Sequence, residues 1–142
     1  MCAVELPNFQ HISDKATATQ LRLISDQDVP SANDTKTHSK AWTGQLTTGP
    51  FFLFLDEMTG AKGTATSCGV VGDVPDLDTF LTESVQSLEL ASAPQPELGG
   101  DGSRSFVWQG PYGRQSMLIL RDFKPIGKRG AMLKLVNMVA SH

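Results

Sequence analysis

The sequence predicts a single α+β domain, with five to six mostly antiparallel strands in one sheet and one or two helices packed on one face of it. Three observations predict this class. The chain has 142 residues, the length of one domain. Its strand-like segments are joined mainly by short turns, which is typical of antiparallel sheets. One segment, residues 73–90, has the apolar spacing of a helix that packs on a sheet.

The N-terminal segment, residues 8–24, is predicted to form a helix. Its apolar residues recur at spacings of three, four and seven: Phe9, Ile12, Ala16 and Leu23. A short strand over residues 20–24 is the alternative, because β-branched threonines weaken the helix just before it. Residues 25–41 are polar, lack periodicity and contain Pro30, so we expect a long, flexible surface connection there.

A strand-rich block follows, beginning with a short candidate strand at residues 42–47. Residues 51–57, FFLFLDE, are apolar on both faces, which predicts a central strand. Residues 58–63 contain two glycines and predict a hairpin loop. The partner strand is expected at residues 64–71, with Cys68 in its middle.

Residues 73–90 give the clearest helix of the chain. Its apolar residues lie on one face of a helix with a 3.6-residue period: Leu77, Phe80, Leu81, Val85 and Leu88. Pro75 suits the first turn of such a helix. Residues 91–104 contain two prolines and three glycines, and therefore predict a flexible connection within the same domain.

The C-terminal third is predicted to be a β-meander. Its strands are expected at residues 105–109, 114–122 and 131–140, separated by turns that contain glycine and proline. A terminal helix is the alternative for the last segment, but its valines and the meander before it favour a strand. The sequence shows no internal repeat and no low-complexity tract.

The composition leaves two compartments open. The longest apolar runs are far shorter than the roughly 20 residues of a membrane span, so we expect a soluble protein. The first ten residues lack the basic and apolar regions of a signal peptide. The chain is therefore either cytoplasmic or exported after removal of a signal peptide. A charged fraction of 19% and an abundance of serine and threonine favour a periplasmic or secreted protein.

Cys2 and Cys68 are the only cysteines of the sequence. In an exported protein they predict one disulfide, which closes a loop of about 65 residues and contributes about 4 kcal/mol in the chain-entropy model. In a cytoplasmic protein they are two separate thiols. The three histidines, His11, His38 and His142, are scattered and match no zinc spacing, so no metal and no cofactor is expected.

No pattern in the sequence indicates catalysis. The glycine-rich stretches match neither a P-loop nor a dinucleotide-binding motif, and are interpreted as turns. Cys68 is a candidate nucleophile only if a histidine lies beside it as a base. Asp56 and Glu57 are adjacent in a strand, so their side chains point to opposite faces and cannot act as a pair. Trp42, Trp108 and Tyr112 are more typical of core packing than of a ligand pocket.

Charge is distributed unevenly along the chain. Residues 1–103 carry a net charge of −9 and residues 104–142 a net charge of +6. The basic residues that form the best candidate binding surface are Arg114, Arg121, Lys124, Lys128 and Arg129. Such a group suits an acidic protein partner or a small anion, and the alternative is a solvated loop. An isoelectric point near 5.5 makes nucleic acid an unlikely partner.

The sequence therefore predicts a small non-enzymatic binding or interaction domain. An early cysteine before a helix, a second cysteine in a strand and a following helix led by Pro-Asp resemble small exported bacterial domains, but this resemblance assigns no functional residue. Two alternative functions remain: a cysteine-dependent enzyme that uses Cys68, and a small-molecule-binding module of the sensor type.

Overall fold

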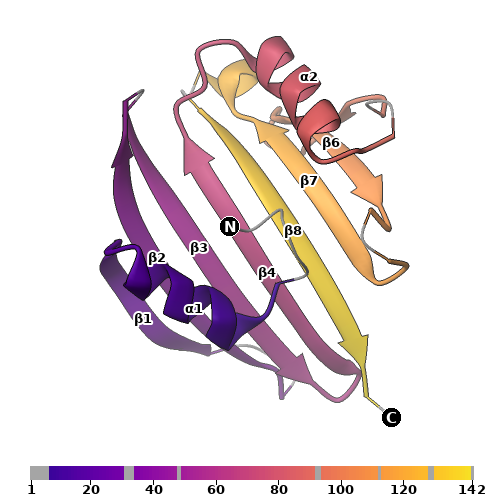
Figure 1. Ribbon diagram of the computed structural model, residues 1–142. Coiled ribbons are helices and arrows are strands. Elements are labelled where there is room, and N and C mark those ends of the chain that lie inside the picture. The colour runs from indigo at the N-terminus through magenta and orange to yellow at the C-terminus, as the bar shows by residue number, and fades with distance from the viewer. Residues whose placement is uncertain are drawn as a thin grey trace.

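The computed structural model describes residues 7–30, 34–47, 49–91, 94–111, 113–127 and 130–141. Within these ranges, two short α-helices and a single 3₁₀ turn accompany eight strands (Figure 1). In chain order the elements are α1 (Phe9–Ala18), β1 (Arg22–Pro30), β2 (Lys36–Leu46), β3 (Gly49–Gly60), β4 (Gly63–Gly72), α2 (Leu77–Ser87), β5 (Glu97–Leu98), β6 (Arg104–Gln109), β7 (Ser116–Asp122), η1 (Lys124–Ile126) and β8 (Ala131–Ala140).

The strands form one antiparallel sheet in the order β1-β2-β3-β4-β8-β7-β6-β5. The expectation of five to six strands is therefore wrong, and the molecule is mostly sheet. The largest error concerns residues 25–41, which form most of β1 and the first part of β2 instead of a flexible connection. β1 is an edge strand that is exposed along nearly its whole length, so polar residues are tolerated there, and Pro30 lies at its last position.

The segment 91–104 also differs from the expected connection, although less. Glu97 and Leu98 form the two-residue strand β5, which pairs with Ser105 and Arg104 of β6. This short strand closes the second edge of the sheet. The other predicted strands of the meander are present as β6, β7 and β8.

Both helices begin at a side-chain cap. The Asn8 side chain accepts a hydrogen bond from the N–H of His11 at the start of α1, and Asp76 accepts bonds from the N–H groups of Asp78 and Thr79 at the start of α2. α1 ends at Ala18, well before residue 24, and the chain enters β1 at Arg22. The helix predicted over residues 73–90 is present but shorter: α2 spans Leu77–Ser87, and Pro75 lies before its N-cap, Asp76, instead of in its first turn.

The same order of elements occurs twice along the chain. A helix followed by four strands makes up α1 to β4, and a second helix followed by four strands makes up α2 to β8. The sheet is continuous because the last strands of the two halves, β4 and β8, pair with each other along their whole length. The two halves are thus arranged about the β4–β8 pair (Figure 1).

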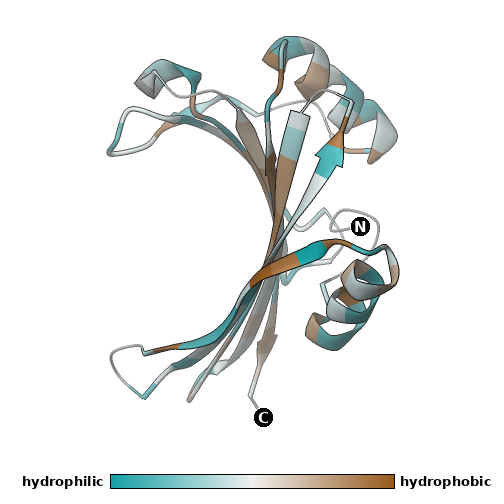
Figure 2. Cartoon of the chain, turned by 90° about the vertical axis from the view of Figure 1, so that its left-hand side faces the viewer, coloured by the Kyte–Doolittle hydropathy of each residue, from teal (hydrophilic) through white to brown (hydrophobic). Residues whose placement is uncertain are grey.

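Both helices lie on the same side of the curved sheet (Figure 2). In the register, Leu55 of β3 lies opposite Cys68, Cys68 opposite Leu135, and Leu135 opposite Leu118, so these side chains share one face. α1 packs on this face over Trp42, Leu53, Leu55 and Cys68, and α2 packs over the part formed by β6, β7 and β8. Within the described residues, no helix is long and apolar enough to cross a membrane.

Candidate functional site

The face of the sheet that points away from α1 and α2 is the candidate functional site, and we call it the open face. Because side chains alternate along a strand, its members are those that alternate with the core residues. Neither helix covers it, yet it is rich in apolar side chains. These are Phe52, Phe54, Met58, Val71, Val107, Met117, Ile119, Met132, Val136 and Met138.

Two phenylalanines of β3 form the aromatic part of the open face. The rings of Phe52 and Phe54 are stacked, with centroids 6.4 Å apart and an interplanar angle of 26°. Their exposed fractions are 39% and 38%, well above those of the core leucines on the same strand. Gly69 of β4 lies beside Phe54 in the register, and Lys134 lies on its other side. The Lys134 side chain lies against the bare backbone of Gly69, since a Cβ added there would be 3.5 Å from Lys134 Cβ.

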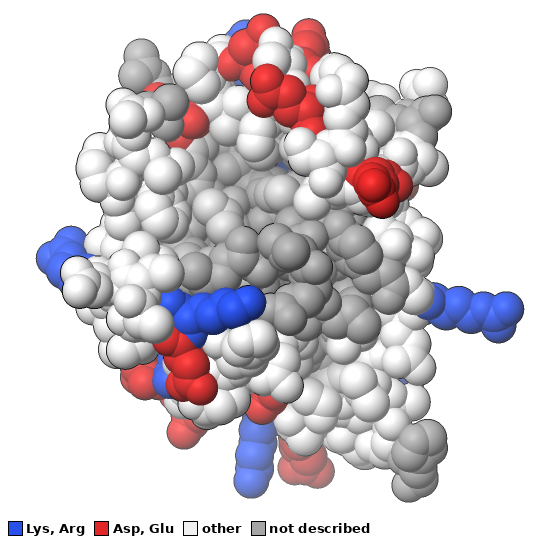
Figure 3. All heavy atoms as spheres, viewed as in Figure 1, with Lys and Arg blue, Asp and Glu red and all other residues white. Residues whose placement is uncertain are grey.

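Two charged side chains of the open face, Arg121 and Asp56, have polar partners, whereas Lys134 lies between Gly69 and Ile119 in the register. The Arg121 guanidinium lies 2.8 Å from Asp101 Oδ2, its Nε donates to Ser103 Oγ, and it lies over the Phe123 ring. Hydrogen bonds from the Ser103 hydroxyl and N–H, helped by Arg121, lower the pKa of Asp101 to about 2. Ser39 donates to Asp56. The opposite side of the molecule differs, because carboxylates gather there over α2 (Figure 3).

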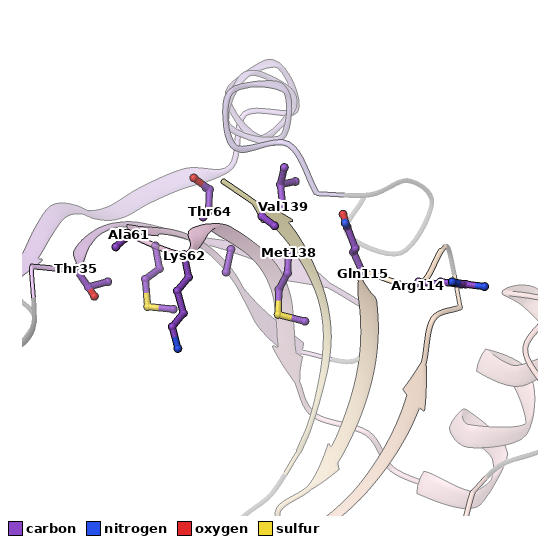
Figure 4. Close-up of a pocket in the computed structure, with 13 residues that line it drawn as sticks. Thr35, Ala61, Lys62, Thr64, Arg114, Gln115, Met138 and Val139 are labelled. Carbon is purple, nitrogen blue, oxygen red and sulfur yellow. The ribbon is translucent and has the colours of Figure 1, made fainter. Parts of the chain in front are cut away.

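All four described methionines lie on the open face: Met58, Met117, Met132 and Met138. Met58 and Met138 flank Ala65 across three neighbouring strands, and both are nearly half exposed. They line a pocket of about 610 Å³ at the end of the sheet where the β3–β4 hairpin turns. Lys62 and Met138 point to the same side there, whereas Thr64 and Val139 point to the other side (Figure 4).

The structure describes three of the five residues of the predicted basic group. Arg114 lies in the turn before β7, and Lys124 lies in η1 after it, so a strand about 20 Å long separates them. Arg121 is held by Asp101, as described above. Lys128 and Arg129 lie outside the described residues.

The Cys68 environment does not resemble a catalytic site. Its side chain is 0% exposed and packs beneath α1 with Ile12 and Leu55. His11 is on the exposed side of α1, and His38 is bonded to carboxylates of β1. No cysteine among the described residues is a free thiol. Cys2 lies outside those residues, so the Cys2–Cys68 disulfide stays a prediction.

The remaining candidates are structural. Trp42 packs beneath α1, and Trp108 packs beneath α2 while its Nε1 donates to the Ala91 carbonyl at 3.3 Å. Tyr112 lies outside the described residues. Asp56 and Glu57 lie on opposite faces of the sheet, since their register partners Ser39 and His38 alternate along β2.

His38 holds the edge strand β1 to β2. Its Nδ1 lies 2.6 Å from Asp28 Oδ1, its Nε2 lies 2.9 Å from Asp26 Oδ1, and its ring packs edge-on against Phe9 of α1. The hydrogen bond to Asp28 raises the pKa of His38 above its usual value of 6.5, and the charges of both carboxylates add to the effect while desolvation opposes it. Lys40 also contacts Asp26, at 3.6 Å.

We expect this contact to make stability depend on pH near neutrality. A pKa raised in the folded state means that the stabilisation is fully present below about pH 6.5 and is lost as the pH rises through the folded-state pKa. The His38 side chain is 37% exposed, so screening by solvent keeps the effect below about 1 kcal/mol. Melting temperatures measured from pH 6 to 9 should fall more for the wild type than for His38→Gln. Parallel curves would contradict this role of His38.

No metal site and no relative supplies a further indication of function. Among the described residues, no group of three or more histidine, cysteine, aspartate or glutamate side chains is placed to hold a metal ion. Comparisons of the chain with protein-family models, with curated proteins and with solved structures found no match.

Proposed function

We propose that this protein is a non-catalytic binding domain that holds a protein partner on its open face. One observation carries the proposal: both helices pack on one side of the sheet, and the bare side displays stacked phenylalanines and four methionines. In a sheet whose second face only meets solvent, alternating polar side chains are the usual pattern. An apolar face therefore favours a second function for those strands.

The chemistry of the open face favours a protein over other partners. The centres of protein interfaces are depleted in charge and enriched in aromatic residues and methionine. Methionine is also common on surfaces that adapt to a partner, because its side chain is flexible and polarisable. Nucleic acid requires a basic stripe, whereas Arg121 is neutralised by Asp101.

The size of the open face is sufficient for a specific complex. Eight strands at a spacing of about 4.8 Å give a width of roughly 34 Å. With β7 about 20 Å long, the face covers roughly 700 Å², close to the ~800 Å² that each partner contributes to a standard interface.

The decisive experiment compares capture by two matched variants. In Phe52→Ser/Phe54→Ser, two exposed aromatic side chains are removed from the open face; in Leu98→Ser, an apolar side chain that is 80% exposed is removed from the helix side. A partner captured by the wild type and then purified should bind the phenylalanine variant at least 30-fold more weakly, because central aromatic residues dominate interfaces. Its affinity for Leu98→Ser should stay within threefold.

Circular dichroism and thermal melting verify that both variants are folded. Unchanged affinity in a folded Phe52→Ser/Phe54→Ser protein contradicts the proposal. Loss of affinity in Leu98→Ser alone contradicts it as well, since that result places the partner on the helix side.

The proposal retains export to the periplasm or the exterior, with Cys2 bonded to Cys68. Cys68 is fully buried beneath α1, and Pro7, which lies just before α1, is also buried. A cysteine-dependent enzyme is less consistent with this burial, because substrate has no access to Cys68.

A further inference from the structure

A second cavity lies on the helix side of the sheet, and we call it the α2 pocket. It has a volume of about 580 Å³ and lies between the first turns of α2 and the ends of β3, β4 and β8. Its floor is formed by Phe51, Val70 and Leu133, and Phe80 of α2 contributes to its wall. Ligand pockets in proteins commonly have volumes of about 300–1,000 Å³ and apolar linings.

The register explains why space remains beneath α2. Phe51 of β3 lies opposite Gly72 of β4, and Gly72 lies opposite Ala131 of β8, so these three residues form a row across the sheet. In this row Gly72 has no side chain and Ala131 has a single methyl group. Larger side chains at these positions would fill the gap between the sheet and the helix. The cavity is therefore a consequence of the sequence at one row of the sheet.

The rim of the α2 pocket is acidic. Asp73, Asp76 and Glu83 are the charged residues that line it among the described residues. Arg104 and Lys124 lie behind this rim, where they line an adjoining hollow together with Asp73 and Asp76, and the charge of Lys124 helps to lower the pKa of Asp76. Asp76 is engaged in capping α2, with its pKa lowered mainly by the Thr79 hydroxyl. Asp73 and Glu83 are exposed and form no ion pair with another described residue. Residues 73–90 contain five acidic residues and no basic one, which agrees with the carboxylates seen over α2 (Figure 3).

From this geometry we infer that the α2 pocket binds a small amphipathic cation. The apolar part of the ligand lies against Phe51, Val70 and Leu133, and its ammonium group lies at the rim beside Asp73 and Glu83. An anion of the same shape is repelled by the same carboxylates. This site lies on the opposite side of the sheet from the open face, so it is independent of the proposed protein-binding function.

The inference is tested with three probes of equal chain length: octylamine, octanol and octanoate, which at pH 7 are cationic, neutral and anionic. In isothermal titration calorimetry at low salt, octylamine should bind most tightly, octanol less tightly and octanoate most weakly. Octylamine should bind at least tenfold more tightly than octanoate. The difference should decrease at high salt, because exposed charges are screened. Equal or tighter binding of octanoate overturns the inference, and so does the absence of octylamine binding up to millimolar concentration.

Two variants assign the binding to the pocket. Asp73→Asn/Glu83→Gln should weaken octylamine binding by between about three- and tenfold and leave octanol unchanged, as expected for two exposed charges. Glu89→Gln makes the same kind of charge change just beyond α2, outside the pocket lining, and should have no effect. If the rim variant and Glu89→Gln behave alike, the rim is not the ammonium site.

Filling the cavity gives an independent readout. Ala131 is 4% exposed and lines the pocket floor, so Ala131→Leu should abolish binding of all three probes. Thermal melting verifies the fold of this variant, and ligand-induced stabilisation provides a second measure of binding. Undiminished octylamine binding by folded Ala131→Leu places the ligand elsewhere and overturns the inference.

Discussion

Replacing Leu135 by alanine is expected to lower the free energy of unfolding by about 3–5 kcal/mol, the range measured for buried leucines. Leu135 is 0% exposed and lies in the middle of β8, opposite Cys68 of one half of the sheet and Leu118 of the other. The two halves join along the β4–β8 pair. A cavity at this point therefore weakens both the α2 core and the connection between the halves.

Urea denaturation followed by circular dichroism measures this loss directly. Val139→Ala is the matched control, because Val139 is on the same strand and is 52% exposed. We expect the control to lose less than about 1 kcal/mol. If Leu135→Ala loses no more than Val139→Ala, the β4–β8 pair is not the centre of the fold.

The second large effect is expected on reduction of the predicted Cys2–Cys68 disulfide. A bridge that closes a loop of about 65 residues contributes about 4 kcal/mol in the chain-entropy model. For a domain of this size, its loss lowers the melting temperature by roughly 12 °C. Addition of a reductant should produce this decrease in the wild type and leave the melting temperature of Cys2→Ser unchanged.

The state of the two sulfurs is established by mass spectrometry after alkylation. Cys68 is fully buried, so the alkylating reagent must be applied to protein unfolded under non-reducing conditions. We expect no alkylated cysteine without prior reduction and two alkylated cysteines after it. Two alkylated cysteines before reduction would contradict the bridge and, with it, the main chemical support for export.

The sequence predicts elements well where local pattern and burial agree. The apolar stripe of residues 77–88 lies against the sheet as α2, and the turn residues between 105 and 140 separate β6, β7 and β8. The error at residues 25–41 has a physical cause. An edge strand with both faces exposed needs no apolar alternation, so β1 has the composition of a loop.

The repeated order of elements could not be predicted from residue identities. The edge strand of the first half, β1, has nine residues, whereas its counterpart β5 has two. The repetition concerns the order of helices and strands, whereas the lengths and side chains of the elements differ. It therefore becomes visible only when the helices and strands are located in the structure.

The sequence contains the apolar residues of the open face, but their pattern fits two different structures. Phe52 and Phe54 make residues 51–57 apolar on both faces, which is also the pattern of a strand covered on both sides. The same applies to Met132, Val136 and Met138 of β8. Periodicity indicates which side chains share a face of the sheet. It does not indicate whether a helix covers that face, because this depends on where α1 and α2 pack. Among the basic residues, Arg114 lies before β7, whereas Arg121 and Lys124 lie at the other end of this strand.

Methionine methyl NMR tests the binding role of the open face most directly, since the four described methionines all lie there. The protein is labelled with ¹³C at its methionine and leucine methyl groups and titrated with the purified partner. We predict that the signals of Met58, Met117, Met132 and Met138 shift or broaden, while those of Leu81 in α2 and Leu88 at its C-cap stay in place. Shifts at Leu81 and Leu88 with unchanged methionine signals would place the partner on the helix side and contradict the proposed function.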